Sequence, residues 1–418
     1  MKSRKVKVMS LKVKQSINML SVAMILLCVY VFFSYNALDI IFPQVLNSIS
    51  LYAFIAYSAF VFVVHIKRKA ETFINVYTIW YLLFMTISAL SMLYSEENNL
   101  LSGAFYLMIV SFVISFFYIF LIREQKMFDI VCGAYFVSAI VLIITLMLTG
   151  NMNPESSERL GKELMGNANI FASMICTSAM YGIWVVTFKK INLIVKSLMI
   201  CGLVLNFYAL ALSGGRRSFV VPIIFLFVIM LVKAKSVSYK KVIKYLVIIV
   251  ALIVVVVYAV SNIDVLYKSI GIRFEGLING ITGAGTQDNS SRMRDEMRSL
   301  ALQTWIDNPI FGHGFDSFKY LALENIGAFA YSHCNYTELL YNNGLVGFLL
   351  YYSIFALILF KALKQKNVAV EYRAFAIGII VSFLISDYGG ITYNTVITQH
   401  MIALAIVVLN FKKELKNE

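Results

Sequence analysis

The sequence predicts an all-α, polytopic membrane protein with about twelve transmembrane helices and one large extracytoplasmic loop. The first observation is composition: of 418 residues, 60% are hydrophobic and only 14% are charged, and the mean hydropathy is +0.80. A soluble domain of this composition would leave too much apolar surface in water, whereas each bilayer crossing needs about 20 apolar residues. The second observation is that such apolar runs recur along the whole chain.

Apolar runs of about 17 to 25 residues mark the predicted spans. They lie near residues 17–35, 45–66, 72–94, 100–122, 128–149, 168–188, 191–212, 217–233, 242–262, 336–360, 370–386 and 392–410. We therefore predict nine transmembrane helices in residues 1–262. Residues 263–335 form the large extracytoplasmic loop with short amphipathic helices, and residues 336–418 form three further transmembrane helices and a cytoplasmic tail.

Basic residues gather in alternate connections, and this alternation predicts the orientation. They lie in the N-terminal tail, at 67–69, 123–126, 189–190, 233–244 and 361–366, and after Phe411. Because cytoplasmic loops are enriched in Lys and Arg, both termini are predicted on the cytoplasmic side of the inner or plasma membrane. The same loops account for the net charge of +14, so no nucleic-acid partner is expected.

Arginines at the predicted outer face break this alternation and need another reason. Arg216 and Arg217 follow a diglycine and open a predicted helix, so that its free N–H groups and positive dipole end would face the same side as the two guanidinium groups. Arginine also binds phosphate oxygens through paired hydrogen bonds. The pattern favours a phosphate site, although snorkelling into lipid headgroups is the alternative explanation.

The large loop contains a second group of cations. Arg294 and Arg298 share one face of a predicted amphipathic helix, and Met293, Met297 and Leu300 form an apolar stripe that favours a position on the membrane surface. Arg292 precedes them. On such a helix, arginines are usually solvated surface charges, and this alternative stays open.

His333 lies just before the tenth predicted span. Asn335 and Glu338 have the spacing of an N-cap and an N3 residue, which would fix His333 at a helix start where an imidazole can accept a proton. A structural role is the alternative. His313, His333 and Cys334 lack further ligands at a recognisable spacing, and nucleotide-binding motifs are missing from the sequence, so neither metal nor cofactor is expected.

In their order and position these residues resemble the bacterial O-antigen ligase and Wzy-type polysaccharide polymerase superfamily. Members typically show a Ser-x-Ser-Arg-like run that opens a helix, an arginine in a long outer loop, a Pro-Leu-x-Gly-x-Gly-Phe-like run and a His-Asn-x-Tyr-Leu-like run. The corresponding segments here are Ser213–Arg216, Arg294, Pro309–Phe315 and His333–Tyr336, with Gly344–Gly347 beyond them and a similar earlier segment from Arg159 to Asn169. Gly215 and Cys334 depart from the pattern.

The resemblance implies a GT-C-like membrane glycosyltransferase whose donor is a polyprenyl-pyrophosphate-linked oligosaccharide. It implies that His333 orients or deprotonates the attacking sugar hydroxyl, while Arg216 and Arg294 stabilise the departing pyrophosphate. The residues expected to bind substrate are Arg217, Arg159, Asn169, Arg292, Tyr336 and Glu338. Glu338 is equally explained as a helix cap, and Tyr336 as an interfacial anchor.

Three functions fit these observations. The leading hypothesis is a polymerase that joins lipid-linked repeat units, with a chain-length regulator and a flippase as partners. A ligase that moves finished glycan to another acceptor would use the same donor chemistry. A flippase or other transporter would also have about twelve helices, but transporters usually place ionisable residues near the bilayer midplane.

Overall fold

The computed structural model describes residues 2–39, 42–65, 75–95, 103–152, 159–235, 239–282 and 289–411. Within these ranges every regular element is a helix. Eight of the described helices are long and apolar enough to cross a membrane, and the shorter apolar helices Val76–Ser91 and Val396–Val408 accompany them. This confirms an all-α, multi-pass membrane protein, while the count of about twelve spans stays a prediction.

The first half of the chain alternates long apolar helices with short connections. The helices are α1 (Lys2–Asn36), α2 (Val45–His65), α4 (Val76–Ser91), α5 (Gly103–Leu121), α6 (Gln125–Leu148), α7 (Lys162–Met165), α8 (Ala168–Phe188) and α9 (Leu193–Leu212). Asparagine caps set several of the starts. The side-chain oxygen of Asn75 accepts the Thr78 N–H at 2.9 Å, and that of Asn192 accepts the Val195 N–H at 2.8 Å.

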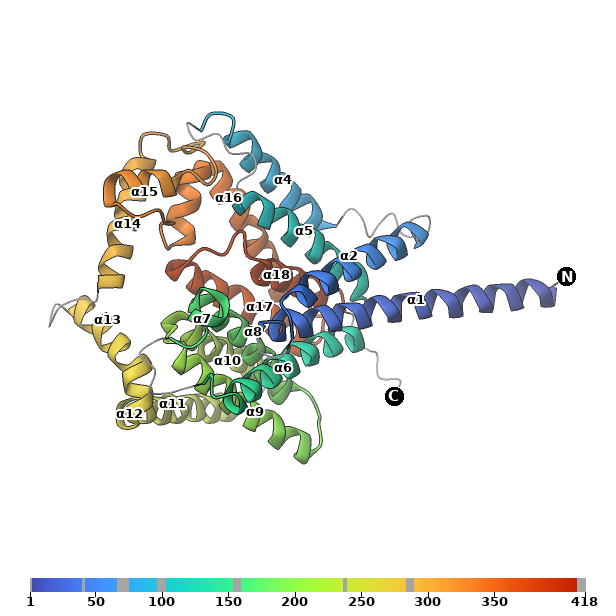
Figure 1. The fold of residues 1–418 in the computed structure, drawn as a ribbon. Coiled ribbons are helices and arrows are strands. Elements are labelled where there is room, and N and C mark those ends of the chain that lie inside the picture. Colours follow the sequence, from blue (N-terminus) through green and yellow to red (C-terminus); the bar gives the residue numbers. More distant parts are fainter. Residues whose placement is uncertain are drawn as a thin grey trace.

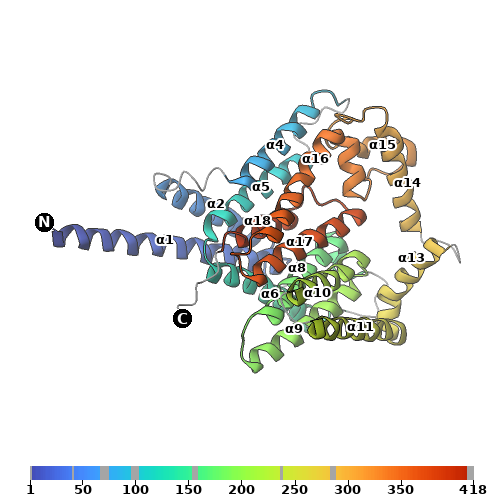
Figure 2. The same cartoon turned by 180° about the vertical axis from the view of Figure 1, so that it is seen from behind.

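The second half contains the remaining spans and the helices of the large loop. In order they are α10 (Arg216–Lys235), α11 (Tyr239–Asn262), α12 (Asp264–Leu266), the π-helix η2 (Tyr267–Gly271), α13 (Ile272–Thr282), α14 (Asn289–Trp305), α15 (Phe318–Ile326), α16 (Asn335–Lys364), α17 (Val370–Ser386), the 3₁₀ turn η3 (Asp387–Gly389) and α18 (Val396–Val408). In Figures 1 and 2, α12 to α15 run along one side of the molecule, away from the chain termini.

Helix α18 lies at the centre of the bundle. It is buried from Thr398 to Val408 and packs against α5 and α17. The surrounding helices instead expose large apolar side chains such as Val63, Leu198 and Val204, which are 64%, 66% and 63% exposed. This distribution suits an outer ring of helices that faces lipid and an inner core that faces protein.

Contacts between connections support the predicted alternation of loops. The Leu160 N–H donates to the Leu212 carbonyl at 3.2 Å, and the Tyr94 hydroxyl donates to the Phe311 carbonyl at 2.7 Å. Further contacts join residue 214 to residue 273 and residue 335 to residue 392. Five of the six connections predicted to lie outside therefore meet at one end of the bundle.

The apolar stripe of α14 packs on protein, which corrects the predicted membrane-surface helix. Met297 is fully buried in a small cluster with Phe318 of α15 and Tyr341 of α16, and Leu300 packs against the same cluster. Only Met293 of the stripe is exposed, at 40%. The reason is that α15 and the first part of α16 give the stripe a protein surface to cover, so the arginine-bearing face of α14 points elsewhere.

The Pro309–Gly314 run fills a break in α16 at Gly344, where φ is +62°. The N–H groups of His313 and Gly314 donate to the carbonyls of residues 341 and 342 at 2.8 and 2.9 Å, and the Leu345 N–H donates to the Pro309 carbonyl at 2.9 Å. The His313 ring stacks on Tyr341 at 4.6 Å. This run is therefore a structural clamp that sets the direction of the first part of α16.

Candidate functional site

Two arginines meet at the turn between α9 and α10. Gly214 makes this turn with φ of +60°, and a Cβ there would lie 2.9 Å from Arg273 Nε, so the diglycine gives space to an arginine side chain of the same protein. Arg216 Nη1 donates to the Arg273 carbonyl at 2.8 Å, and its Nη2 donates to the Ser291 hydroxyl at 2.9 Å. These bonds join the starts of α10, α13 and α14.

Arg159 extends this group from the preceding loop. Its Nε donates to the Ser213 carbonyl at 2.7 Å, and its Nη2 donates to Asn169 Oδ1 at 2.8 Å. Burial, and then the charges of Arg273, Arg294 and Arg216, lower the pKa of Arg159 to about 10. After burial, the contribution of these three like charges to the pKa indicates that other cations lie near Arg159. We call Arg159, Arg216, Arg273 and Arg294 the arginine cluster.

His333 lies beside the same charges. It is partly buried and takes φ of +57°, a backbone conformation that is uncommon for a residue with a side chain. Burial and then the charges of Arg294, Arg217 and Arg298 lower the pKa of His333 to about 4, so its imidazole is neutral near pH 7. In the part of the chain that the structure describes, neither ring nitrogen of His333 forms a hydrogen bond. A neutral, unoccupied imidazole is suited to accept a proton.

Arg217 points toward the connection between α17 and α18. Its Nη1 donates to the Ser386 carbonyl at 3.3 Å, and a Cβ at Gly390 would collide with its guanidinium group. The buried Asp387 carboxylate accepts hydrogen bonds from Thr392 Oγ1 at 2.6 Å and from the Tyr352 hydroxyl at 2.7 Å. Burial outweighs these donors and the nearby charge of Arg217, and raises the pKa of Asp387 to about 7.

Two of these cations lie at a helix N-terminus. Arg216 and Arg217 are the first residues of α10, whereas Arg273 lies inside the continuous helical stretch formed by α12, η2 and α13. The positive end of a helix dipole disfavours cations by about 0.3–1 kcal/mol each and favours anions. The N-terminus of α10 and the guanidinium groups around it form an arrangement that can hold an anion such as phosphate.

The predicted N-cap at Asn335 is corrected by the structure. The cap residue is Cys334, and the Asn335 side chain instead accepts the Thr392 and Tyr393 N–H groups at 2.9 and 3.1 Å. Glu338 is fully buried and accepts the Ser332 N–H at 2.8 Å. The segment before His333 curls back over the first turn of α16, so Asn335 and Glu338 brace the histidine instead of closing a capping box.

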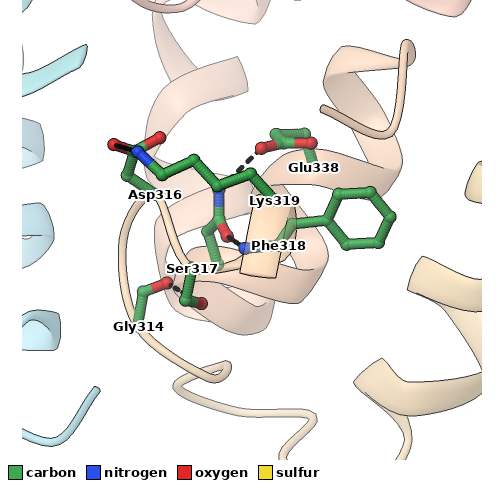
Figure 3. Close-up of polar contacts among 7 residues, drawn as sticks. Gly314, Asp316, Ser317, Phe318, Lys319 and Glu338 are labelled. Carbon is green, nitrogen blue, oxygen red and sulfur yellow. Dashed lines mark hydrogen bonds and ion pairs between the residues drawn. The ribbon is translucent and has the colours of Figure 1, made fainter. Parts of the chain in front are cut away.

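Figure 3 shows the polar contacts around Glu338. Asp316 pairs with Lys319 at 2.6 Å, and the Ser317 hydroxyl donates to the Gly314 carbonyl at 2.6 Å. Asn342 donates to Glu338 at 3.1 Å and accepts the Phe318 N–H at 3.3 Å. These contacts give Glu338 protein partners and attach α15 to α16.

Tyr336 and Arg292, which were also predicted to bind substrate, have contacts outside the arginine cluster. Tyr336 stacks on Tyr352 at 5.1 Å and donates its hydroxyl to the Leu384 carbonyl. The Arg292 side chain is 67% exposed and lies 3.7 Å from Glu296. Both contacts are of the kind that stabilises a fold or covers a surface.

Sequence reasoning missed three residues of this region as site residues. They are Arg273, Arg298 and Asp387, of which the first two contribute charge to the cluster and to His333. Arg273 could have been found from the sequence, because it is a further arginine in a segment predicted to lie outside. The sequence gives no reason to select Asp387, because a single acidic residue in a short connection is ordinary.

The fold and site together define a multi-pass membrane protein with a cluster of arginines beside a neutral histidine at one end of its helix bundle. Residues 201–352 match a family model, Wzy_C, described as O-Antigen ligase. The match supports a relationship of this segment to the O-antigen ligase and Wzy-type superfamily. The matched segment contains Arg216, Arg217, Arg273, Arg294 and His333. No curated protein matches the chain in sequence.

Proposed function

We propose that the chain is a Wzy-type polymerase that joins lipid-linked oligosaccharide repeat units into capsular, exopolysaccharide or O-antigen chains at the outer face of the cytoplasmic membrane. The observation that carries the proposal is the arginine cluster beside His333. Arg216 bonds to the Arg273 carbonyl and to Ser291 of α14, the helix that carries Arg294, and the charge of Arg294 contributes to lowering the pKa of His333. One end of the site would hold a diphosphate, and the other would hold the hydroxyl that replaces it.

The proposed step is a substitution at the anomeric carbon of the donor sugar. A hydroxyl of the acceptor unit attacks this carbon, the bond to the diphosphate oxygen breaks, and its electron pair leaves with the polyprenyl diphosphate. His333 takes the hydroxyl proton and later passes it to water, a role worth about 10²–10⁴ in rate. Arg216 and Arg294 stabilise the charge on the leaving oxygen, and removal of one such group costs about 10²–10³ in rate.

The low pKa of His333 in the free protein suits this order of events. Bound diphosphate brings negative charge beside the same arginines, which raises the affinity of the imidazole for a proton. His333 would therefore become an effective base only when a donor occupies the site. The energy of the reaction comes from the sugar diphosphate bond, so the proposal requires no nucleotide.

The test is to incubate the purified protein with lipid-linked repeat units from cells that lack it, without nucleotide or added metal, and to measure product length. We expect long chains from the wild type, none from the Arg216→Ala and His333→Ala variants, and unchanged chains from the Arg292→Ala control. In cells, the first two variants should leave single units on the outer leaflet. Units retained on the inner leaflet would instead indicate a flippase.

A ligase is the second candidate, because the matched family model is described as an O-Antigen ligase. A ligase would use the same donor site but a different acceptor. It would leave the repeat units unchanged in this assay until another acceptor is supplied, and would then add one glycan to each acceptor molecule. Product length therefore separates the two enzymes.

A further inference from the structure

Tyr388 is the aromatic residue of η3, and it lies among residues of the site. Its neighbour Asp387 is fully buried, whereas the Tyr388 side chain is 62% exposed. On the other side, Gly389 and Gly390 pack against the Arg217 side chain. A residue with larger side-chain volume at position 390 would push this turn away from Arg217, so the backbone that carries Tyr388 is held against the site.

Arg298 fixes the orientation of the Tyr388 ring. Its guanidinium carbon lies 4.5 Å from the ring centroid, in a cation–π contact. Arg298 is itself held by an ion pair with Asp295 and by a bond from its Nε to the Arg294 carbonyl at 3.2 Å. Arg298 is also close enough to His333 to lower the pKa of that histidine. The ring of Tyr388 therefore lies near the proposed base, with one face covered and the remainder exposed.

We propose that Tyr388 forms a sugar-binding subsite that stacks on a pyranose ring of the acceptor unit, the sugar whose hydroxyl faces His333. This inference rests on the proposed function. A pyranose presents an apolar face of C–H groups that packs on an aromatic ring. A ring whose orientation is already fixed in the free protein loses little conformational entropy when the sugar binds. A cation over the opposite face leaves the exposed face as the only one open to a ligand.

The experiment measures initial rates of polymerisation at varied concentrations of lipid-linked repeat units from cells lacking this protein. We expect Tyr388→Ala to raise KM about tenfold, the ratio that corresponds to about 1.4 kcal/mol, with kcat at saturation largely retained. Tyr388→Phe keeps the ring and should behave as the wild type. The matched control is Tyr258→Ala, because Tyr258 is 68% exposed near the end of α11.

Each other result overturns the inference. A Tyr388→Ala enzyme with the KM of the wild type or of the Tyr258→Ala control would show that Tyr388 is a surface aromatic only. A Tyr388→Phe enzyme as poor as Tyr388→Ala would assign the effect to the hydroxyl instead of the ring. A wild-type protein that does not elongate the units would overturn the proposed function as well, so the two failures are distinguishable.

Discussion

Cations at the two ends of the helix bundle have different surroundings, as two lysines and a group of arginines show. Helix α10 begins with Arg216 and Arg217 and reaches Lys233 near its other end, while α8 begins near Asn169, a partner of Arg159, and ends just before Lys189. Lys189 pairs with Asp129 at 2.8 Å and lies over the Trp184 ring at 4.9 Å, and Lys233 donates to the Thr187 carbonyl. The lysines have carboxylate, carbonyl and aromatic partners, whereas Arg159 lies among other arginines.

The helix dipole explains why this difference is informative. Lysines near helix C-termini are stabilised by the dipole, and those at the predicted cytoplasmic end also fit the usual loop composition. Arginines at helix N-termini oppose the dipole and one another, so they cost stability. Folding alone accounts for the lysine end, and the proposed binding of a diphosphate would account for the arginine end.

A first prediction exchanges the cation type at each end. Arg216→Lys keeps the charge but loses the paired hydrogen bonds of the guanidinium group, and we expect the polymerisation rate to fall about 10- to 100-fold. Lys189→Arg keeps the charge next to Asp129 and should leave the rate unchanged. Initial rates with purified variants measure both, and equal losses at the two ends would contradict the distinction between them.

A second prediction concerns the pH at which His333 acquires a proton. Because its pKa is lowered to about 4, kcat/KM should fall only near pH 4 and not near 6.5, the usual pKa of histidine. Arg298→Gln removes one of the nearby positive charges, so the pKa should rise and the acid limb should move toward 6.5. An acid limb near 6.5 in the wild type that Arg298→Gln does not move would show that the arginines do not control His333.

The sequence predicted more of the fold than of the site, for a physical reason. Apolar length and loop charge are local properties, so the helical class and the mutual position of the outer connections could be predicted. The burial of Met297 required knowledge of α15 and α16, and the partners of Asn335 lie more than 50 residues away. Asp387 and Tyr388 became site candidates only when the fold placed them beside Arg217 and Arg298.

A third and smaller effect is expected for stability. The pKa of Asp387 in the folded protein is about 7, above its ordinary 3.8, so the folded state binds this proton more tightly than the unfolded state. The contribution of this proton to the free energy of unfolding is therefore fully present below about pH 4 and is lost as the pH rises through 7. Thermal unfolding of Asp387→Asn should lack this decline, so that the Tm difference from the wild type changes between pH 5 and pH 8. A constant difference would contradict the raised pKa.

The smallest effect is expected for Arg292→Ala, which is compared with Arg294→Ala two residues further along α14. Arg292 is 67% exposed and pairs weakly with Glu296, so Arg292→Ala should change the free energy of unfolding by no more than about 0.5 kcal/mol and leave polymerisation unchanged. Arg294 is partly buried and perturbs Arg159 and His333, so Arg294→Ala should lower the rate about 10²-fold or more. Because both variants remove one positive charge from the same helix, a general loss of electrostatic attraction would reduce both rates equally. A reduced rate only for Arg294→Ala would show that position relative to His333, and not net charge, determines the function of these arginines.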